Sequence, residues 1–206
     1  MCIFLGYNIF SRMELLFLGF FSKNEEAAKY QILLRISDLI VVPDVLFNYF
    51  LPQKFAHYFA GNNIDEAKKL YTNAAKTILM LQGLCFLGAA TVGYFYLRSF
   101  AIASSGTYIL LVILCSAPMF TSLFGSSNII LKASGNERFS FYALLIILII
   151  EALANNYLIP LYGLEAAIGI SWMSILLYNL LLSFFVHKRL QFYSKYSGIL
   201  FSGKKK

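Results

Sequence analysis

Five ionisable side chains lie inside the first two apolar segments of the sequence, where a bilayer would offer them no solvation. These residues are Arg12, Glu14, Arg35, Asp38 and Asp44. Each charge at the centre of a membrane helix costs about 2.5–3.5 kcal/mol, and such residues usually face a substrate or ion pathway. A negatively charged head group is the simplest compensation for Arg12 and Arg35, the only basic residues away from the predicted membrane edges.

The spacing of these charges restricts how they can be arranged. Arg12 and Glu14 are about 200° apart around a helix, so at least one of them must meet another helix or water. Arg35 and Asp38 are three residues apart and can pair on one face. Asp44 follows Pro43 and is either near a helix break or an interfacial carboxylate. We consider two interpretations, structural ion pairs and a hydrated transport cavity, and favour the cavity.

The composition is that of an integral membrane protein. Of 206 residues, 59% are hydrophobic and 13% are charged, with a mean hydropathy of +0.69, whereas soluble domains carry about 25% charged residues. The net charge of +7 comes from Lys and Arg between apolar runs, which is typical of membrane orientation and not of nucleic-acid binding. We find no catalytic, metal or cofactor motif and expect neither an enzyme nor a nucleic-acid partner.

The apolar runs predict an all-α membrane protein with six transmembrane helices. An apolar stretch of about 20 residues crosses a bilayer, and the candidates are 1–21, 30–52, 74–97, 107–131, 139–160 and 164–186. They form one lobe over 1–190, followed by a basic tail over 191–206. The connection 54–72 predicts a short surface helix, capped by Asn63 with Glu66 three residues later. In the fifth run the only charge is Glu151, and Asn155 lies one turn later on the same face.

Basic residues predict the orientation of the lobe, because short cytoplasmic loops collect Lys and Arg. With the N-terminus inside, twelve basic residues lie on the inner side, against Lys23, Lys29 and Arg98 outside. The inner set is Lys54, Lys68, Lys69, Lys76, Lys132, Arg138, Lys188, Arg189, Lys195, Lys204, Lys205 and Lys206. We therefore expect both termini in the cytoplasm, a multi-pass protein of the inner (cytoplasmic) membrane, and a tail that contacts anionic membrane lipids.

Three segments resemble a known transporter family. They are ALANNYLIPLYGLEAAIGISWMSILLYNLLLSFFVHKRL (152–190), MELLFLGFFSKNEEAAKYQILLRISDLIVVP (13–43) and ILKASGNERFSFY (130–142). In their order along the chain, they resemble the second half of the polysaccharide transporter branch, the O-antigen and capsule repeat-unit flippases, of the multidrug/oligosaccharidyl-lipid/polysaccharide exporter superfamily. A departure from the family pattern is Glu165, which stands where Gly is usual.

The resemblance implies one lobe of a two-lobe flippase that moves lipid-linked oligosaccharide by alternating access. Arg12 and Arg35 would bind pyrophosphate or an acidic sugar, and Glu14 would take a coupling ion or neutralise an arginine; Asp38 and Asp44 complete the predicted substrate site. We expect a truncated or split chain that needs an N-terminal six-helix lobe or a second copy. The alternatives are a multidrug extruder lobe of the same superfamily, or a nonfunctional remnant or membrane interaction subunit.

Overall fold

A computed structural model describes residues 12–21, 23–61, 63–123 and 127–190. The predicted helical residues 1–11 and the basic tail 191–206 lie outside this part of the chain. The described residues are 92% helix and include no strand, which confirms the all-α class. The helices are α2 (Met13–Phe20), α3 (Asn24–Ala60), α4 (Ile64–Ser99), α5 (Ser105–Leu123), α6 (Ser127–Ala133), α7 (Glu137–Tyr162) and α8 (Leu164–Leu190).

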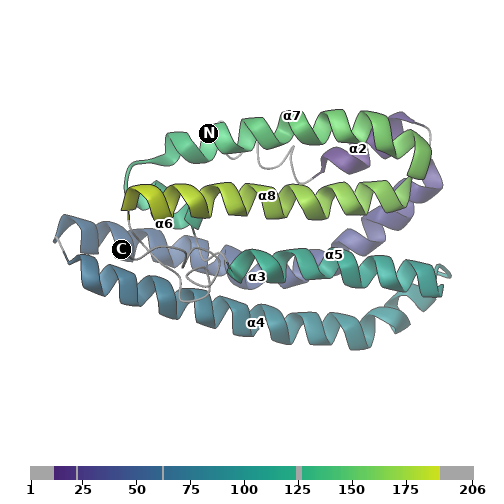
Figure 1. Ribbon diagram of the computed structural model, residues 1–206. Coiled ribbons are helices and arrows are strands. Elements are labelled where there is room, and N and C mark those ends of the chain that lie inside the picture. Colours follow the sequence, from purple (N-terminus) through teal and green to yellow (C-terminus); the bar gives the residue numbers. More distant parts are fainter. Residues whose placement is uncertain (1–11, 22, 62, 124–126, 191–206) are drawn as a thin grey trace, which may run out of the picture.

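The long helices run back and forth as a bundle (Figure 1). α3 packs against α4, α7 packs against α8, and α5 lies between these hairpins in contact with both α4 and α8. The short helix α2 touches α3, α7 and α8. α3 has 37 residues and α4 has 36, so each is about 55 Å long, well beyond the roughly 30 Å of a hydrocarbon core.

Four of the described helical stretches are long and apolar enough to cross a membrane. They are Asp65–Ser99, Ser105–Ser122, Glu137–Tyr162 and Leu164–Lys188. The predicted count of six is therefore not confirmed. Of the first run only residues 12–21 are described, and eight of them form α2. α3 carries the charges Arg35, Asp38 and Asp44 along its length.

The predicted surface helix over 54–72 is wrong, because its residues end α3 and begin α4. Asn63 does precede α4, but its side chain makes no capping hydrogen bond, and Glu66 instead pairs with Lys69 at 2.8 Å. Phe55 and Tyr71 are fully buried. Burial of these large side chains extends both helices into the core, where a surface helix would have left them exposed.

One further feature, the course of α3 past its prolines, differs from the prediction. α3 continues through Pro43 and Pro52, so no helix break lies beside Asp44; Pro43 is buried, and packed neighbouring helices compensate for the missing backbone donor. Within the predicted helix over 107–131, the described residues belong to α5 as far as Leu123 and to α6 from Ser127, and residues 124–126 lie outside the described part of the chain.

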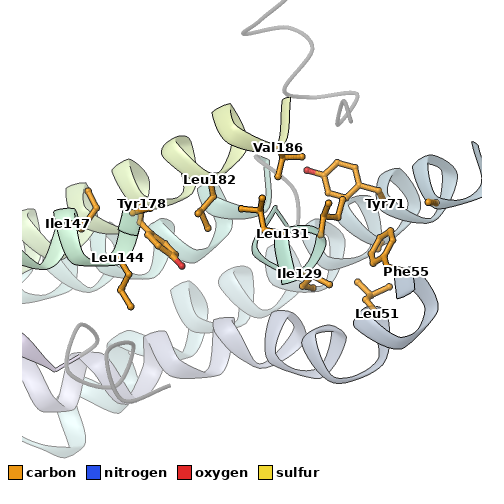
Figure 2. Close-up of a cluster of buried hydrophobic side chains, with 14 residues drawn as sticks. Leu51, Phe55, Tyr71, Ile129, Leu131, Leu144, Ile147, Tyr178, Leu182 and Val186 are labelled. Atoms are coloured by element: carbon orange, nitrogen blue, oxygen red, sulfur yellow. The ribbon is translucent and has the colours of Figure 1, made fainter. Parts of the chain in front are cut away.

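Two hydrophobic clusters hold the bundle together. One gathers Leu51 and Phe55 of α3, Tyr71 of α4 and Leu131 of α6 with Leu182 and other residues of α7 and α8 (Figure 2). The second joins α2 and the first half of α3 to α4, α5 and the α7–α8 turn. The short helices α2 and α6 are thereby fixed by burial, since neither has enough residues to be stable alone.

The two ends of the bundle differ in how many basic residues they carry. The α3–α4 connection, the α6–α7 connection and the C-terminal end of α8 lie together at the left of Figure 1. We call this the basic end; its described basic residues are Lys54, Lys68, Lys69, Lys132, Arg138 and Lys188. The opposite end has Lys23, Lys29 and Arg98. The helix order thus separates the basic residues as the sequence pattern predicts. That the basic end faces the cytoplasm stays a prediction.

Candidate functional site

Arg12 forms an ion pair with Asp38 of α3. Arg12 Nη2 lies 3.4 Å from Asp38 Oδ2, and the two side chains are 41% and 50% exposed. Arg12 Nη1 is buried and makes no hydrogen bond with any residue of the described ranges. The guanidinium therefore has donor capacity left over, next to a carboxylate that water can also reach.

The predicted pairing of Arg35 with Asp38 is wrong. Arg35 is exposed and has no ion pair with any described residue, while Asp38 pairs with Arg12. An i,i+3 pair on one helix is worth only about 0.2–0.5 kcal/mol, so the packing of α2 against α3 readily decides the partner. Both arginines nevertheless lie beside the same turn of α3, since Asp38 is three residues from Arg35.

Arg12 and Glu14 point in different directions, as their spacing predicts. Arg12 is partly exposed, and Glu14 is only 1% exposed. The Glu14 carboxyl faces that of Glu151 on α7 and also interacts with the hydroxyls of Tyr30 on α3 and Ser171 on α8. We call Glu14 and Glu151 the carboxyl pair. Four helices thus converge on one buried polar group.

Several atoms around the carboxyl pair lack hydrogen-bond partners within the described protein. They are Glu14 Oε1 and Glu151 Oε2, together with both side-chain amide atoms of Asn155. Asn155 is fully buried and lies one turn from Glu151 on α7. Leaving a buried polar group unpaired costs about 1–3 kcal/mol. A contact with only a structural role would not be expected to leave this many buried polar atoms without hydrogen-bond partners.

The carboxyl pair is suited to holding a proton or a cation. Two carboxylates in contact repel one another and are poorly solvated when buried, so the pair is stable only when it shares a proton or a cation lies between the oxygens. Glu151 also borders a groove of ≈ 560 Å³ between α7 and α8. This groove is lined mainly by apolar residues such as Ile150, Leu158 and Met173, and it approaches the pair from the outside of the bundle.

Asp44 lies apart from the other predicted site residues. It is half-buried and accepts a hydrogen bond at 2.9 Å from Asn48 Nδ2. Both residues line a cavity of ≈ 120 Å³ with residues of α4, α5, α6 and α8. The five predicted residues therefore belong to different places: the Arg12–Asp38 pair beside Arg35, the carboxyl pair, and this cavity.

One face of α3 is not covered by the rest of the lobe. It begins at Arg35 and Asp38 and continues as large apolar side chains that are 45–73% exposed. Those side chains are Leu39, Val42, Val45, Leu46, Tyr49 and Phe50. We call this the α3 face. Its residues recur at helical spacing, so one partner surface or the lipid can cover them together.

Comparison with known proteins assigns no family or function to this chain. No protein-family model matches the chain, and no curated protein or solved structure is significantly similar to it. The flippase resemblance therefore stays a prediction.

Sequence reasoning identified Glu14 but not the group around it. Glu151 and Asn155 could be recognised as a polar pair on one helix face, since Glu151 is the only charge near the centre of its apolar run. Tyr30 and Ser171 carry no such signal, because Tyr and Ser are common in membrane helices. Their part in the site depends on how α3 and α8 pack around α2.

Proposed function

We propose that this chain is the C-terminal lobe of a lipid-linked oligosaccharide flippase that works by alternating access, and that it is not an enzyme. The observation that carries the proposal is the position of Arg12 and Arg35 beside one turn of the uncovered α3 face. Arg35 has no ion-pair partner in the described protein, and Arg12 has an unpaired donor. Two guanidiniums arranged in this way suit a pyrophosphate or an acidic sugar.

The partner in this scheme covers the α3 face. An N-terminal six-helix lobe, or a second copy of the chain, would close a cavity whose polar part contains Arg12, Arg35 and Asp38. The apolar part, from Leu39 to Phe50, would contact the partner lobe or the lipid tail of the substrate. The basic end would face the cytoplasm of a cell whose inner membrane carries the substrate.

The carboxyl pair would supply the coupling ion or proton. Glu14 and Arg12 are two residues apart at the start of α2, so a change in the spacing of Glu14 and Glu151 would also move the guanidinium. Binding or release of a cation at the pair would thereby change how Arg12 is presented to an anionic head group. Asp38 would be released from Arg12 as the phosphate binds.

The proposal can be tested by complementation. The chain would be coexpressed with the N-terminal lobe of a family member in bacteria that lack their own flippase, and surface polysaccharide and membrane abundance would be measured together. We expect Arg12→Gln and Arg35→Gln to abolish export at normal abundance, and Arg35→Lys to restore it only in part, because an ammonium lacks the planar fork.

Arg98→Gln is the matched control. Arg98 is exposed in the last turn of α4 and should tolerate the change. Lower abundance with unchanged export per molecule would make the arginines structural and remove this assignment. Export of cationic drugs without any effect on polysaccharide would favour the multidrug alternative. If the substitutions reduce neither polysaccharide export nor drug export, a membrane interaction subunit would be favoured.

A further inference from the structure

The cavity beside Asp44 is a second polar site, separate from the carboxyl pair. It has a volume of ≈ 120 Å³ and lies among α3, α4, α5, α6 and α8, and neither Glu14 nor Glu151 is among its lining residues. One water occupies about 30 Å³ of liquid volume. The cavity is therefore large enough for a small ion with a few waters.

Several side-chain donors around this cavity are already used in hydrogen bonds to the helix backbone, which leaves oxygen lone pairs to face it. Thr121 Oγ1 donates to the carbonyl of Pro118 at 2.7 Å, and Ser122 Oγ donates to that of Met119 at 2.8 Å. Each hydroxyl has a single hydrogen, so only lone pairs remain to face the cavity. Asn179 Nδ2 likewise donates to the carbonyl of Ile175 at 2.9 Å.

Asn48 uses its amide hydrogens on Asp44 itself. Its Nδ2 atom donates to the Asp44 carbonyl at 2.8 Å and to Asp44 Oδ2 at 2.9 Å. These bonds hold the carboxylate against α3 and leave Asn48 Oδ1 as an acceptor. The carboxylate is thus fixed in the wall of the cavity by a neighbour that also contributes an oxygen.

Gln82 on α4 gives independent evidence of a missing partner. Its side chain is 1% exposed, it lines the same cavity, and its Oε1 atom is buried without a hydrogen bond. A buried acceptor without a hydrogen-bond partner lowers the stability of the folded protein by about 1–3 kcal/mol. A residue of similar size, such as Leu, would fill the space without this cost, so the retained oxygen points to a ligand.

We propose that the Asp44 cavity binds a monovalent cation of the Na⁺ class. One carboxylate balances one positive charge, and the amide and hydroxyl oxygens complete the coordination. A divalent ion such as Ca²⁺ would favour several carboxylates, and an anion would be repelled by the Asp44 carboxylate in the wall of the cavity. Lys132 interacts electrostatically with Asp44 but is exposed, so it can move away when the cation binds.

A cation at this place would stabilise the arrangement of α3. Asp44 and the α3 face belong to one continuous helix, and the cavity joins that helix to α4, α5 and α8. The inference goes beyond the proposed function and does not depend on it, because cation binding can be measured without any transport substrate.

The test uses the purified full chain in detergent and measures thermal unfolding in NaCl, LiCl, CaCl₂ and choline chloride at constant ionic strength. We expect a saturable rise in Tm with Na⁺ and none with choline. Asp44→Asn should weaken the Na⁺ response at least about tenfold. Asp65→Asn, at an exposed acidic residue of α4, is the matched control and should respond as the parent does.

Gln82→Leu separates lost binding from lost folding. Because it removes an unpaired oxygen, we expect the variant to be at least as stable as the parent without Na⁺ and to gain less from Na⁺. In a Glu14→Gln background, Asp44→Asn should still weaken the Na⁺ response that remains, which distinguishes this site from the carboxyl pair. Binding of ²²Na⁺ to membranes containing the same variants provides a second readout. An unchanged response in Asp44→Asn, an equal response to choline, or a response to Ca²⁺ alone would overturn the proposal.

Discussion

Glu26 Oε2 on α3 accepts a hydrogen bond at 2.8 Å from the backbone N–H of Leu164, the first residue of α8. The bond joins residues 138 positions apart and places a carboxylate at a helix N-terminus, where free N–H groups and the helix dipole favour negative charge. Lys23 lies 3.8 Å from the other carboxylate oxygen. The start of α3 is thereby attached to the α7–α8 turn, and α2 is held between them.

This contact depends on Gly163, which precedes Leu164 in the turn. Gly163 has φ +55° and ψ −124°, and a Cβ atom there would collide with the Glu26 carboxyl. We predict that Gly163→Ala lowers stability by about 1–3 kcal/mol through backbone strain, with a further loss from the displaced Glu26. Thermal unfolding in detergent measures this. Gly169→Ala, where a Cβ meets nothing within 4 Å, should be neutral or stabilising; equal losses in both variants would contradict the account.

A second prediction concerns the carboxyl pair. Glu14→Gln and Glu151→Gln should each leave the chain at least as stable as the parent, since either change removes one of two facing buried carboxyls. In the double variant the effects should not add, because the first substitution has already removed the repulsion. Unfolding of the four proteins gives the coupling energy, and additive effects would mean that the two carboxyls do not meet.

The Arg12–Asp38 contact can be tested by cross-linking. In a chain whose own cysteines are replaced, Arg12→Cys with Asp38→Cys should be joined efficiently by a short thiol-reactive cross-linker, which spans the gap that the arginine side chain bridges. Arg12→Cys with Val45→Cys is the control, because Val45 is exposed about two turns further along α3. Gel mobility after treatment with the cross-linker gives the yield. Equal yields for the two pairs would show that α2 is not held at the Asp38 turn.

A fourth prediction is the orientation of the bundle. Gly135 lies in the α6–α7 connection at the basic end, and Gly163 lies at the opposite end. Fusions at Gly135 should activate a reporter that works only in the cytoplasm, and fusions at Gly163 one that works only outside it. The reverse pattern would invert the proposed topology. The predicted head-group site at Arg12 and Arg35 would then be approached from the opposite side of the membrane.

The amino-acid sequence by itself determined the helical class, the apolar character and the separation of the basic residues. These properties are local: an apolar run of sufficient length forms a helix in lipid, and charges gather at its ends. Helical geometry also determined that Arg12 and Glu14 cannot share a direction, because two residues span about 200° in any α-helix.

Tertiary packing decided where helices end and which charges meet. Burial of Phe55 and Tyr71 extended α3 and α4 through a region that reads as a polar connection, and packing around Pro43 preserved a helix where local rules favour a break. The partners Arg12 and Asp38, Glu14 and Glu151, and Glu26 and Leu164 come from different helices. Their meeting depends on the faces that each helix buries, and side-chain spacing along one helix holds no information about the facing residue on another.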